Sequence, residues 1–429
     1  LRKAEDKEYV VILDFIGNYK NNFMIPIALS GDRSYNKDNV RKYVVSGNSL
    51  IPGASTIHFD EISKERIFNA VDNLKSMKAL IKESYTSLKN RLGRIPRLVD
   101  FYENEEIDPM IIIREYKTYY AMLKAMEKKQ EIEELSDSET LILEYLSKTI
   151  LSGVRPQELE LLKMLLEHNE VSIEEFQEDV SVEFGYLLDM NAIQNTIRIL
   201  QGHFHINSAE HQKYAQIDIL KVNENKRIQR LNSFVSKLNE SEFRKELNDI
   251  ISFGLYRYKD KYNQNKNQGV PFVLYEQYSR RDICFLMDCG KDLSSTMYGM
   301  KKINDDVFIF VTYHKEKTED DAKEYIDGKP DYADVFEDNQ IFCWDTQIGR
   351  GIDSSYTQDV MKAYRKHLMV KKSDAETTFY YMGQFDIAEV KPAKKLDNKG
   401  KERDIAKFRV KMRHAVRDDL LQYLESNID

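Results

Sequence analysis

The sequence is poor in the residues that interrupt secondary structure. Of its 429 residues, 17 are Gly and 8 are Pro, about 4% and 2% against usual frequencies of about 7% and 5%. This composition excludes disordered and collagen-like chains and favours long helices. Hydrophobic residues make up 41% and charged residues 32%, which suits about three globular domains at roughly 150 residues each.

Long apolar runs and cysteine motifs are also missing. No run approaches the ~18 apolar residues of a membrane span, and the charged start, residues 1–6 (LRKAED), is unlike a signal peptide. We therefore expect a cytoplasmic protein with no membrane partner. Because the first residue is not Met, we also expect a fragment of a longer chain. The three cysteines form no CxxC pair, so they predict no zinc site.

The pattern of apolar and polar residues changes along the chain. Residues 9–16 (YVVILDFI) read as one buried strand, whose partners we expect upstream of residue 1. From about 32 to 255 the apolar residues recur with helical spacing. The polar segment 261–269 (KYNQNKNQG) is typical of a boundary loop. Beyond it, short β-branched and aromatic runs predict an α+β domain with a small mixed or barrel-like sheet.

Individual elements follow from the same patterns. Gly93 is expected to end one helix and Pro96 to start the next, and 136–139 (SDSE) and 172–175 (SIEE) resemble helix N-caps. The predicted helices span 59–91, 110–134, 137–150, 156–168, 173–188, 190–202, 208–220, 228–254, 279–289, 356–366 and 415–426. The predicted strands span 306–313, 340–345, 367–372, 378–388 and 405–412.

Catalytic and metal motifs are weak. The sequence contains no phosphate-binding GxxxxGK[ST] loop and no HExxH motif. His211, Lys213 and Asp218 match the HxKx4D pattern of phospholipase-D-type nucleases, but they fall in a predicted helix and occur once. His203 and His205 read as a structural pair, because no further ligand is spaced to complete a metal site. We therefore predict no catalytic residue and no metal site.

The most unusual segment is 342–347 (FCWDTQ), which contains the only Trp of the chain. A flipped base needs a flat surface for stacking and polar groups for its Watson–Crick edge. Trp344 could supply the surface, while Asp345 could accept from the N4 amino group of cytosine. The alternative is a core Trp followed by a turn. A modified-base pocket would comprise Trp344, Asp345, Thr346 and Gln347, with Tyr313 or Tyr380 as the opposite wall.

Basic side chains are concentrated in the C-terminal part, although the net charge of the chain is −8. Residues 391–417 contain 11 basic and 3 acidic side chains, whereas 316–338 contain 3 basic and 10 acidic ones. A solvated face is the ordinary explanation of such a run. Neutralisation of DNA phosphates is the functional one. The candidate contacts to the DNA backbone are Arg280, Arg281, Lys301, Lys302, Arg409 and Arg413.

Several segments resemble a known family. Residues 1–3 (LRK) and 9–19 (YVVILDFIGNY) look like the end of a superfamily 2 helicase core, with Arg2 as the last arginine of the QxxGRxxR motif, which faces the ATP γ-phosphate. Further pieces resemble Type IV restriction endonucleases that act on modified cytosine. These pieces are 92–96 (LGRIP), 278–283 (YSRRDI), 311–315 (VTYHK), 344–347 (WDTQ), 367–372 (HLMVKK) and 379–383 (FYYMG).

The resemblance implies a multidomain architecture. Residues 1–31 would end the second RecA-like helicase lobe, 32–261 would form an all-α coupler domain, and 262–429 would form an SRA-like, PUA-related α+β domain. The expected partners are double-stranded DNA containing 5-methylcytosine or 5-hydroxymethylcytosine and the upstream helicase and nuclease domains of the same chain. ATP and Mg²⁺ are expected cofactors of the full-length enzyme, whereas this fragment should bind neither and be inactive.

Two alternatives remain open at this level. The C-terminal domain could read DNA sequence or structure for a DNA motor, without preference for a modification. The chain could also be a protein-interaction scaffold that retains one helicase strand.

Overall fold

The computed structural model describes residues 67, 76–128, 131–205, 208–263, 269–314, 325–326, 329–330, 334–374, 376–397 and 399–425. Contacts divide the chain into two units, and the helices and strands described here belong to the unit Met77–Glu425. The strand and helicase assignments of residues 1–31, including Arg2, lie outside the described residues. So does most of the acidic segment 316–338.

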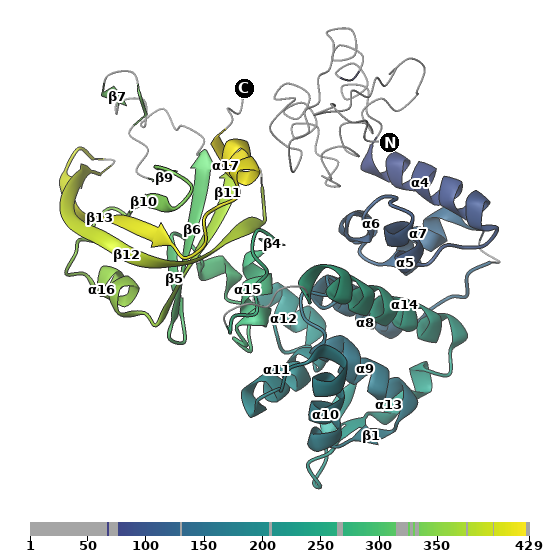
Figure 1. Cartoon of the computed structure of the whole chain (residues 1–429). Coiled ribbons are helices and arrows are strands. Elements are labelled where there is room, and N and C mark those ends of the chain that lie inside the picture. The colour runs from purple at the N-terminus through teal and green to yellow at the C-terminus, as the bar shows by residue number, and fades with distance from the viewer. Residues whose placement is uncertain are drawn as a thin grey trace, which may run out of the picture. The chain divides into compact units, whose positions relative to one another are not determined.

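The N-terminal part of this unit is mainly helical (Figure 1). Gly93 has φ +68° directly after the helix Met77–Leu92, and both predicted N-caps form, with Ser136 and Ser172 accepting from the backbone of Glu139 and Glu175. The helices are α4 (Met77–Leu92), α5 (Leu98–Glu103), α6 (Pro109–Tyr116), α7 (Tyr119–Met126), α8 (Asp137–Thr149), α9 (Gln157–Glu167), α10 (Ile173–Phe184), α11 (Met190–Leu200), α12 (Ser208–Tyr214), α13 (Asn232–Lys237) and α14 (Ser241–Arg257), which a π-helical turn, Tyr258–Tyr262, extends.

The prediction of an all-α segment is wrong in one place. A small antiparallel sheet joins β1 (Glu170–Val171), β3 (Ile228–Arg230) and β2 (Leu220–Val222). The hairpin β2–β3 replaces the end of the helix predicted at 208–220 and the start of that predicted at 228–254. The cause is local, because the Asn223 carboxamide accepts from the backbone of Asn225 and Arg227 and closes a turn. The predicted helix 110–134 is also divided, at Lys117 with φ +70°.

The C-terminal part is built on a mixed eight-stranded sheet with the order β5-β6-β11-β12-β13-β10-β9, and β4 pairs with β12. The pair β6–β11 is parallel, and the other neighbours are antiparallel. All five predicted strands form, four of them within a few residues of the predicted bounds, while the strand predicted at 378–388 continues to Leu396. The strands are β4 (Gln277–Tyr278), β5 (Met300–Ile303), β6 (Asp306–His314), β9 (Val335–Phe336), β10 (Ile341–Asp345), β11 (Arg365–Ser373), β12 (Phe379–Leu396) and β13 (Glu402–Met412).

Short helices accompany this sheet: α15 (Arg280–Leu286), α16 (Ser355–Lys362) and α17 (Asp418–Glu425). The longest strand, β12, pairs with β11 and β4 through its first half and with β13 along the rest. Its pairing with β13 shifts register between Ile387 and Glu389, and such a shift bends a strand. Figure 1 shows β12 and β13 curving together. One apolar core, which includes Phe342, Trp344 and Phe408, is common to β6, β10, β11, β12, β13 and α17.

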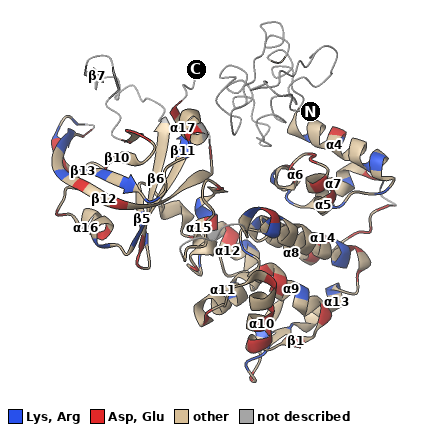
Figure 2. Cartoon of the chain, in the orientation of Figure 1, with Lys and Arg blue, Asp and Glu red and all other residues tan. Residues whose placement is uncertain are grey.

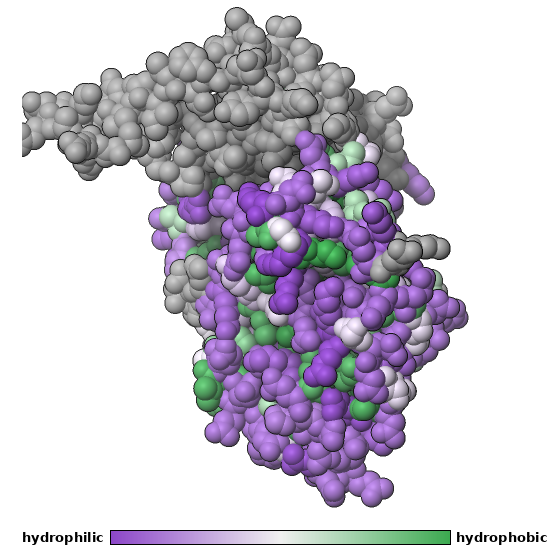
Figure 3. All heavy atoms as spheres, turned by 90° about the vertical axis from the view of Figure 1, so that its right-hand side faces the viewer, coloured by the Kyte–Doolittle hydropathy of each residue, from purple (hydrophilic) through white to green (hydrophobic). Residues whose placement is uncertain are grey.

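No described helix combines the length and apolarity that crossing a bilayer requires. On the face shown in Figure 3 the described surface is mainly hydrophilic, with hydrophobic residues in small separate groups.

Candidate functional site

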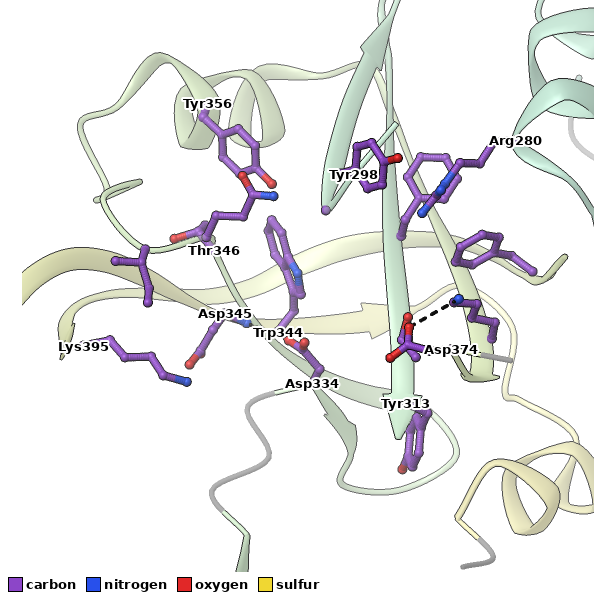
Figure 4. Close-up of a pocket in the computed structure, with 17 residues that line it drawn as sticks. Arg280, Tyr298, Tyr313, Asp334, Trp344, Asp345, Thr346, Tyr356, Asp374 and Lys395 are labelled. Carbon is purple, nitrogen blue, oxygen red and sulfur yellow. Dashed lines mark hydrogen bonds and ion pairs between the residues drawn. The ribbon is translucent and has the colours of Figure 1, made fainter. Parts of the chain in front are cut away.

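A pocket of about 630 Å³ opens in the C-terminal part of the described unit (Figure 4). This volume lies within the roughly 300–1,000 Å³ usual for ligand pockets. Residues of α15, β6, β10, β11 and β12 line it, together with the segments before β5 and after β10. The lining residues are Arg280, Tyr298, Gly299, Phe310, Thr312, Tyr313, Asp334, Trp344, Asp345, Thr346, Gln347, Ile348, Tyr356, Lys371, Asp374, Phe379 and Lys395.

Trp344 forms one wall of the pocket and is also a core residue. Its strand, β10, alternates partly exposed and buried positions, and Trp344 is 3% exposed. The indole packs against Phe408 of β13, with ring centroids 5.2 Å apart. The two explanations of Trp344 that the sequence left open therefore do not exclude each other, because the ring is anchored in the core and borders the pocket.

The three residues after Trp344 are differently placed. Asp345 is partly buried, with its carboxylate 4.0 Å from Lys407 Nζ. The Thr346 hydroxyl donates to the Arg350 carbonyl at 2.6 Å and accepts from the Ala406 amide at 2.8 Å. Both of these bonds hold the loop after β10 in place. Gln347 is exposed at the pocket rim.

The opposite wall is built around Arg280, at the first position of α15. Its guanidinium lies 4.6 Å from the ring centroid of Tyr298 and 5.2 Å from that of Phe379. Arg280 Nε is buried and has no hydrogen-bond partner, and no carboxylate within the described residues pairs with this side chain. Figure 4 shows Arg280 and Tyr298 across the pocket from Trp344. A stacked cation with an unsatisfied donor is suited to an anionic ligand.

Of the two tyrosines predicted to form the opposite wall, only one lines the pocket. Tyr313, near the end of β6, lines the pocket, and burial raises the pKa of its phenol to about 12. Tyr380 does not line the pocket. Its ring instead meets Tyr423 of α17 edge to face at 6.0 Å. The walls that sequence reasoning missed are Tyr298 and Phe379.

Most of the cations expected on the DNA backbone already have partners. Lys and Arg recur along β12 and β13 (Figure 2), where acidic side chains accompany them. Three of these ion pairs are exposed and contribute little, about 0–1 kcal/mol each, whereas Asp292, the partner of Arg281, is buried. The ion pairs are Arg281–Asp292 at 2.8 Å, Lys302–Asp359 at 2.8 Å, Arg409–Glu337 at 2.8 Å and Arg413–Asp386 at 2.9 Å, whereas Lys301 donates to Thr296 Oγ1 at 2.8 Å.

Comparison with known proteins gives three findings. The family model described as domain of unknown function DUF8090 matches residues 81–263, and the model for DUF3427 matches residues 272–424. No curated protein matches the chain. A solved structure described as the sulfur binding domain and SRA domain of ScoMcrA complexed with phosphorothioated DNA is 11% identical, covers 67% of this chain and 90% of that chain, and has a TM-score of 0.21. That score does not establish a common fold. The comparisons therefore show sequence similarity to two successive domain families, whose descriptions give no activity.

Proposed function

We propose that this chain is the target-recognition and coupling part of a modification-dependent restriction endonuclease, and that its pocket receives a modified cytosine turned out of a DNA duplex. The main support for the proposal is that the two opposite walls of the pocket differ in chemistry. Trp344 offers an aromatic surface beside the carboxylate of Asp345, and Arg280 offers a stacked cation opposite.

A nucleotide has the chemistry that these walls complement. Its base is flat, the N4 amino group of cytosine is a donor, and its phosphate is anionic. We assign stacking to Trp344, acceptance from the amino group to Asp345, and a phosphate contact to Arg280. Thr346 positions the loop, and Gln347 is the flexible contact at the rim.

The wider assignment rests on the sequence resemblance. Residues 1–31 resemble the end of a helicase lobe, and the helical part would couple recognition to that motor. The full-length enzyme would then require ATP and Mg²⁺, whereas this chain would have neither ATPase nor nuclease activity. An SRA-like classification of residues 262–429 belongs to the same proposal.

Reading of DNA without a modification preference is the competing function. The pocket volume of about 630 Å³ does not by itself favour a methylated base, since one methyl group is worth roughly 0.8 kcal/mol when buried. Discrimination would therefore need close contact at C5 of the base as well as stacking.

The test uses the single Trp as a reporter. The full chain is titrated with duplexes of identical sequence that carry cytosine, 5-methylcytosine or 5-hydroxymethylcytosine, and both Trp fluorescence and DNA anisotropy are followed. We expect quenching of Trp344 and an affinity for a modified duplex at least roughly tenfold higher, or about 1.4 kcal/mol. Equal affinities would support the competing function, and absence of DNA binding would refute both.

Tyr298 offers a variant that leaves the core intact, because its side chain is 59% exposed. Tyr298→Ala should weaken binding of modified DNA by roughly 5- to 150-fold, the equivalent of about 1–3 kcal/mol for one stacking contact. Tyr364→Ala is the matched control, since Tyr364 is 79% exposed and lies outside the pocket lining. Equal effects of the two substitutions would count against the pocket.

Trp344 requires a conservative substitution. Trp344→Ala would remove a buried core ring at a cost of about 3–5 kcal/mol, which confounds any binding measurement. Trp344→Phe keeps an aromatic ring beside Phe408, so it should destabilise the fold less than Trp344→Ala does and should reduce the affinity ratio between modified and unmodified DNA. An unchanged ratio would make Trp344 a core residue only.

A further inference from the structure

Three potential metal ligands meet away from the pocket. They are His205, which follows α11, Glu210 in α12, and Asp292, which lies between α15 and β5. His205 Nδ1 lies 3.2 Å from Glu210 Oε2 and 3.9 Å from Asp292 Oδ2. One ligand atom from each residue lies within 4.8 Å of the other two.

The imidazole points an unpartnered nitrogen into this group. His205 is 0% exposed, and its Nδ1 has no hydrogen-bond partner. The other ring nitrogen, Nε2, lies 3.5 Å from Thr149 Oγ1. A hydrogen on Nε2 can therefore point to Thr149, which leaves the lone pair of Nδ1 facing two carboxylates. Arg281 is the positive group that contacts both carboxylates, but the lone pair of His205 Nδ1 has no donor of its own.

The outward atoms of both carboxylates are already bound. Glu210 Oε1 pairs with Lys148, and Asp292 Oδ1 accepts from the Ser294 amide at 2.9 Å. Metal ligands are commonly oriented in this way by partners on the side away from the ion. The aromatic rings of Tyr145 and Tyr214 further fix the imidazole, with centroids 5.8 and 5.3 Å from its own.

We propose that His205 Nδ1, Glu210 Oε2 and Asp292 Oδ2 bind a divalent transition metal ion of the Zn²⁺ class. One nitrogen and two oxygens suit Zn²⁺, which accepts imidazole and carboxylate ligands and completes four-coordination with water. Imidazole is a poor ligand for Mg²⁺, so that ion is not expected here. The site joins the range matched by the first domain family, through His205 and Glu210, to the range matched by the second, through Asp292.

Arg281 is the group that competes with a metal. Its Nε lies 2.8 Å from Asp292 Oδ2, and its Nη2 lies 3.6 Å from Glu210 Oε2, so it contacts both inward oxygens. The side chain is partly exposed, and a bound ion would displace it toward solvent. Because Arg281 opposes the metal electrostatically, its removal should strengthen metal binding. If the group is only an ion-pair cluster, the same removal gives no gain in metal affinity.

The test is a Zn²⁺ titration of the chelator-treated full chain by calorimetry and thermal unfolding. We expect one tight site, a loss of more than about 100-fold in Zn²⁺ affinity in His205→Phe, and tighter binding in Arg281→Met. Phe retains the ring packing of His205. His203→Phe, at an exposed neighbouring position, is the matched control and should bind Zn²⁺ as the wild type does. Absence of a tight site, unchanged affinity in His205→Phe, or weaker binding in Arg281→Met would overturn the proposal.

Discussion

Asp249 of α14 is an unusually placed carboxylate. Its side chain is 8% exposed, Oδ2 accepts from the Leu98 amide at 3.0 Å, and Oδ1 is buried without a hydrogen-bond partner. Burial raises the pKa of this carboxyl to about 6, against an ordinary value of 3.8. One helical turn earlier, burial and the charge of Asp249 raise the pKa of Glu246 as well. The folded chain therefore carries a carboxylate at neutral pH that its surroundings disfavour.

The contribution of Asp249 to stability decreases as the pH rises. The folded state binds the proton more tightly than the unfolded state, so this contribution to stability is complete below about pH 3.8 and is lost as the pH rises through about 6. The pKa difference, about 6 minus 3.8, corresponds to about 3 kcal/mol. Asp249→Asn removes the charge, and its amide oxygen can still accept from Leu98. We expect the variant to be more stable at neutral pH by about 1–3 kcal/mol.

The assay is urea unfolding followed by far-ultraviolet circular dichroism, at about pH 4, 6 and 8, across the range in which the carboxyl titrates. The gain in the free energy of unfolding of Asp249→Asn over the wild type should be near zero at the lowest pH and largest at the highest. Asp353→Asn makes the same chemical change at an exposed position and should give no gain. A variant less stable than the wild type at about pH 8 would refute the reasoning.

Two further pairs of substitutions test backbone conformation at the pocket and a buried ion pair in the helical part. Gly299→Ala should lower both stability and DNA affinity, because φ is +65° and the new Cβ would lie 2.7 Å from Gln347 Nε2. Gly93→Ala is the control, because Gly93 has φ +68° and no neighbour within 4 Å of the new Cβ. Its loss in the free energy of unfolding, measured with urea, gives the cost of the backbone conformation alone, about 1–2 kcal/mol. Arg155→Met should cost about 3–5 kcal/mol by leaving the buried Glu158 without its ion-pair partner. Adding Glu158→Gln should restore part of that loss, and an equally unstable double variant would contradict this explanation.

The sheet was the most predictable part of the fold. The run 306–313 (DVFIFVTY) is apolar nearly throughout, and it forms β6, an internal strand between β5 and β11. The segment 341–345 alternates in burial, as expected of a strand with one face on the core. In both cases the pattern along the chain is the pattern of burial, so the sequence carries the information directly.

The hairpin β2–β3 was not predictable from apolar spacing. Leu220, Val222 and Ile228 fit a helical stripe as well as two short strands. The deciding interaction is the turn held by the Asn223 carboxamide. A search for Asn, Gly and Asp at possible turns within helical stretches would have indicated the interruption.

The pocket was predictable on one side only. Trp344 stands out because no other Trp occurs in the chain, and Asp345, Thr346 and Gln347 follow it directly. The opposite wall joins Arg280 of α15, Tyr298 before β5 and Phe379 of β12. No spacing along the chain signals that meeting, because it arises when β12 pairs with β4, next to the start of α15.

The neighbours Arg280 and Arg281 show why residue type and position in the sequence do not fix a role. Both were assigned to the DNA backbone on the same grounds. Adjacent residues of a helix point about 100° apart, and α15 directs Arg280 between aromatic rings in the pocket while Arg281 meets Asp292 and Glu210. Of the two, Arg280 is therefore the residue for which we propose the phosphate contact, because its Nε has no hydrogen-bond partner. For Arg281 a phosphate would first have to displace the carboxylates of Glu210 and Asp292. Substitution of Arg280 should therefore lower DNA affinity, whereas substitution of Arg281 should change the stability of its contacts with these two carboxylates.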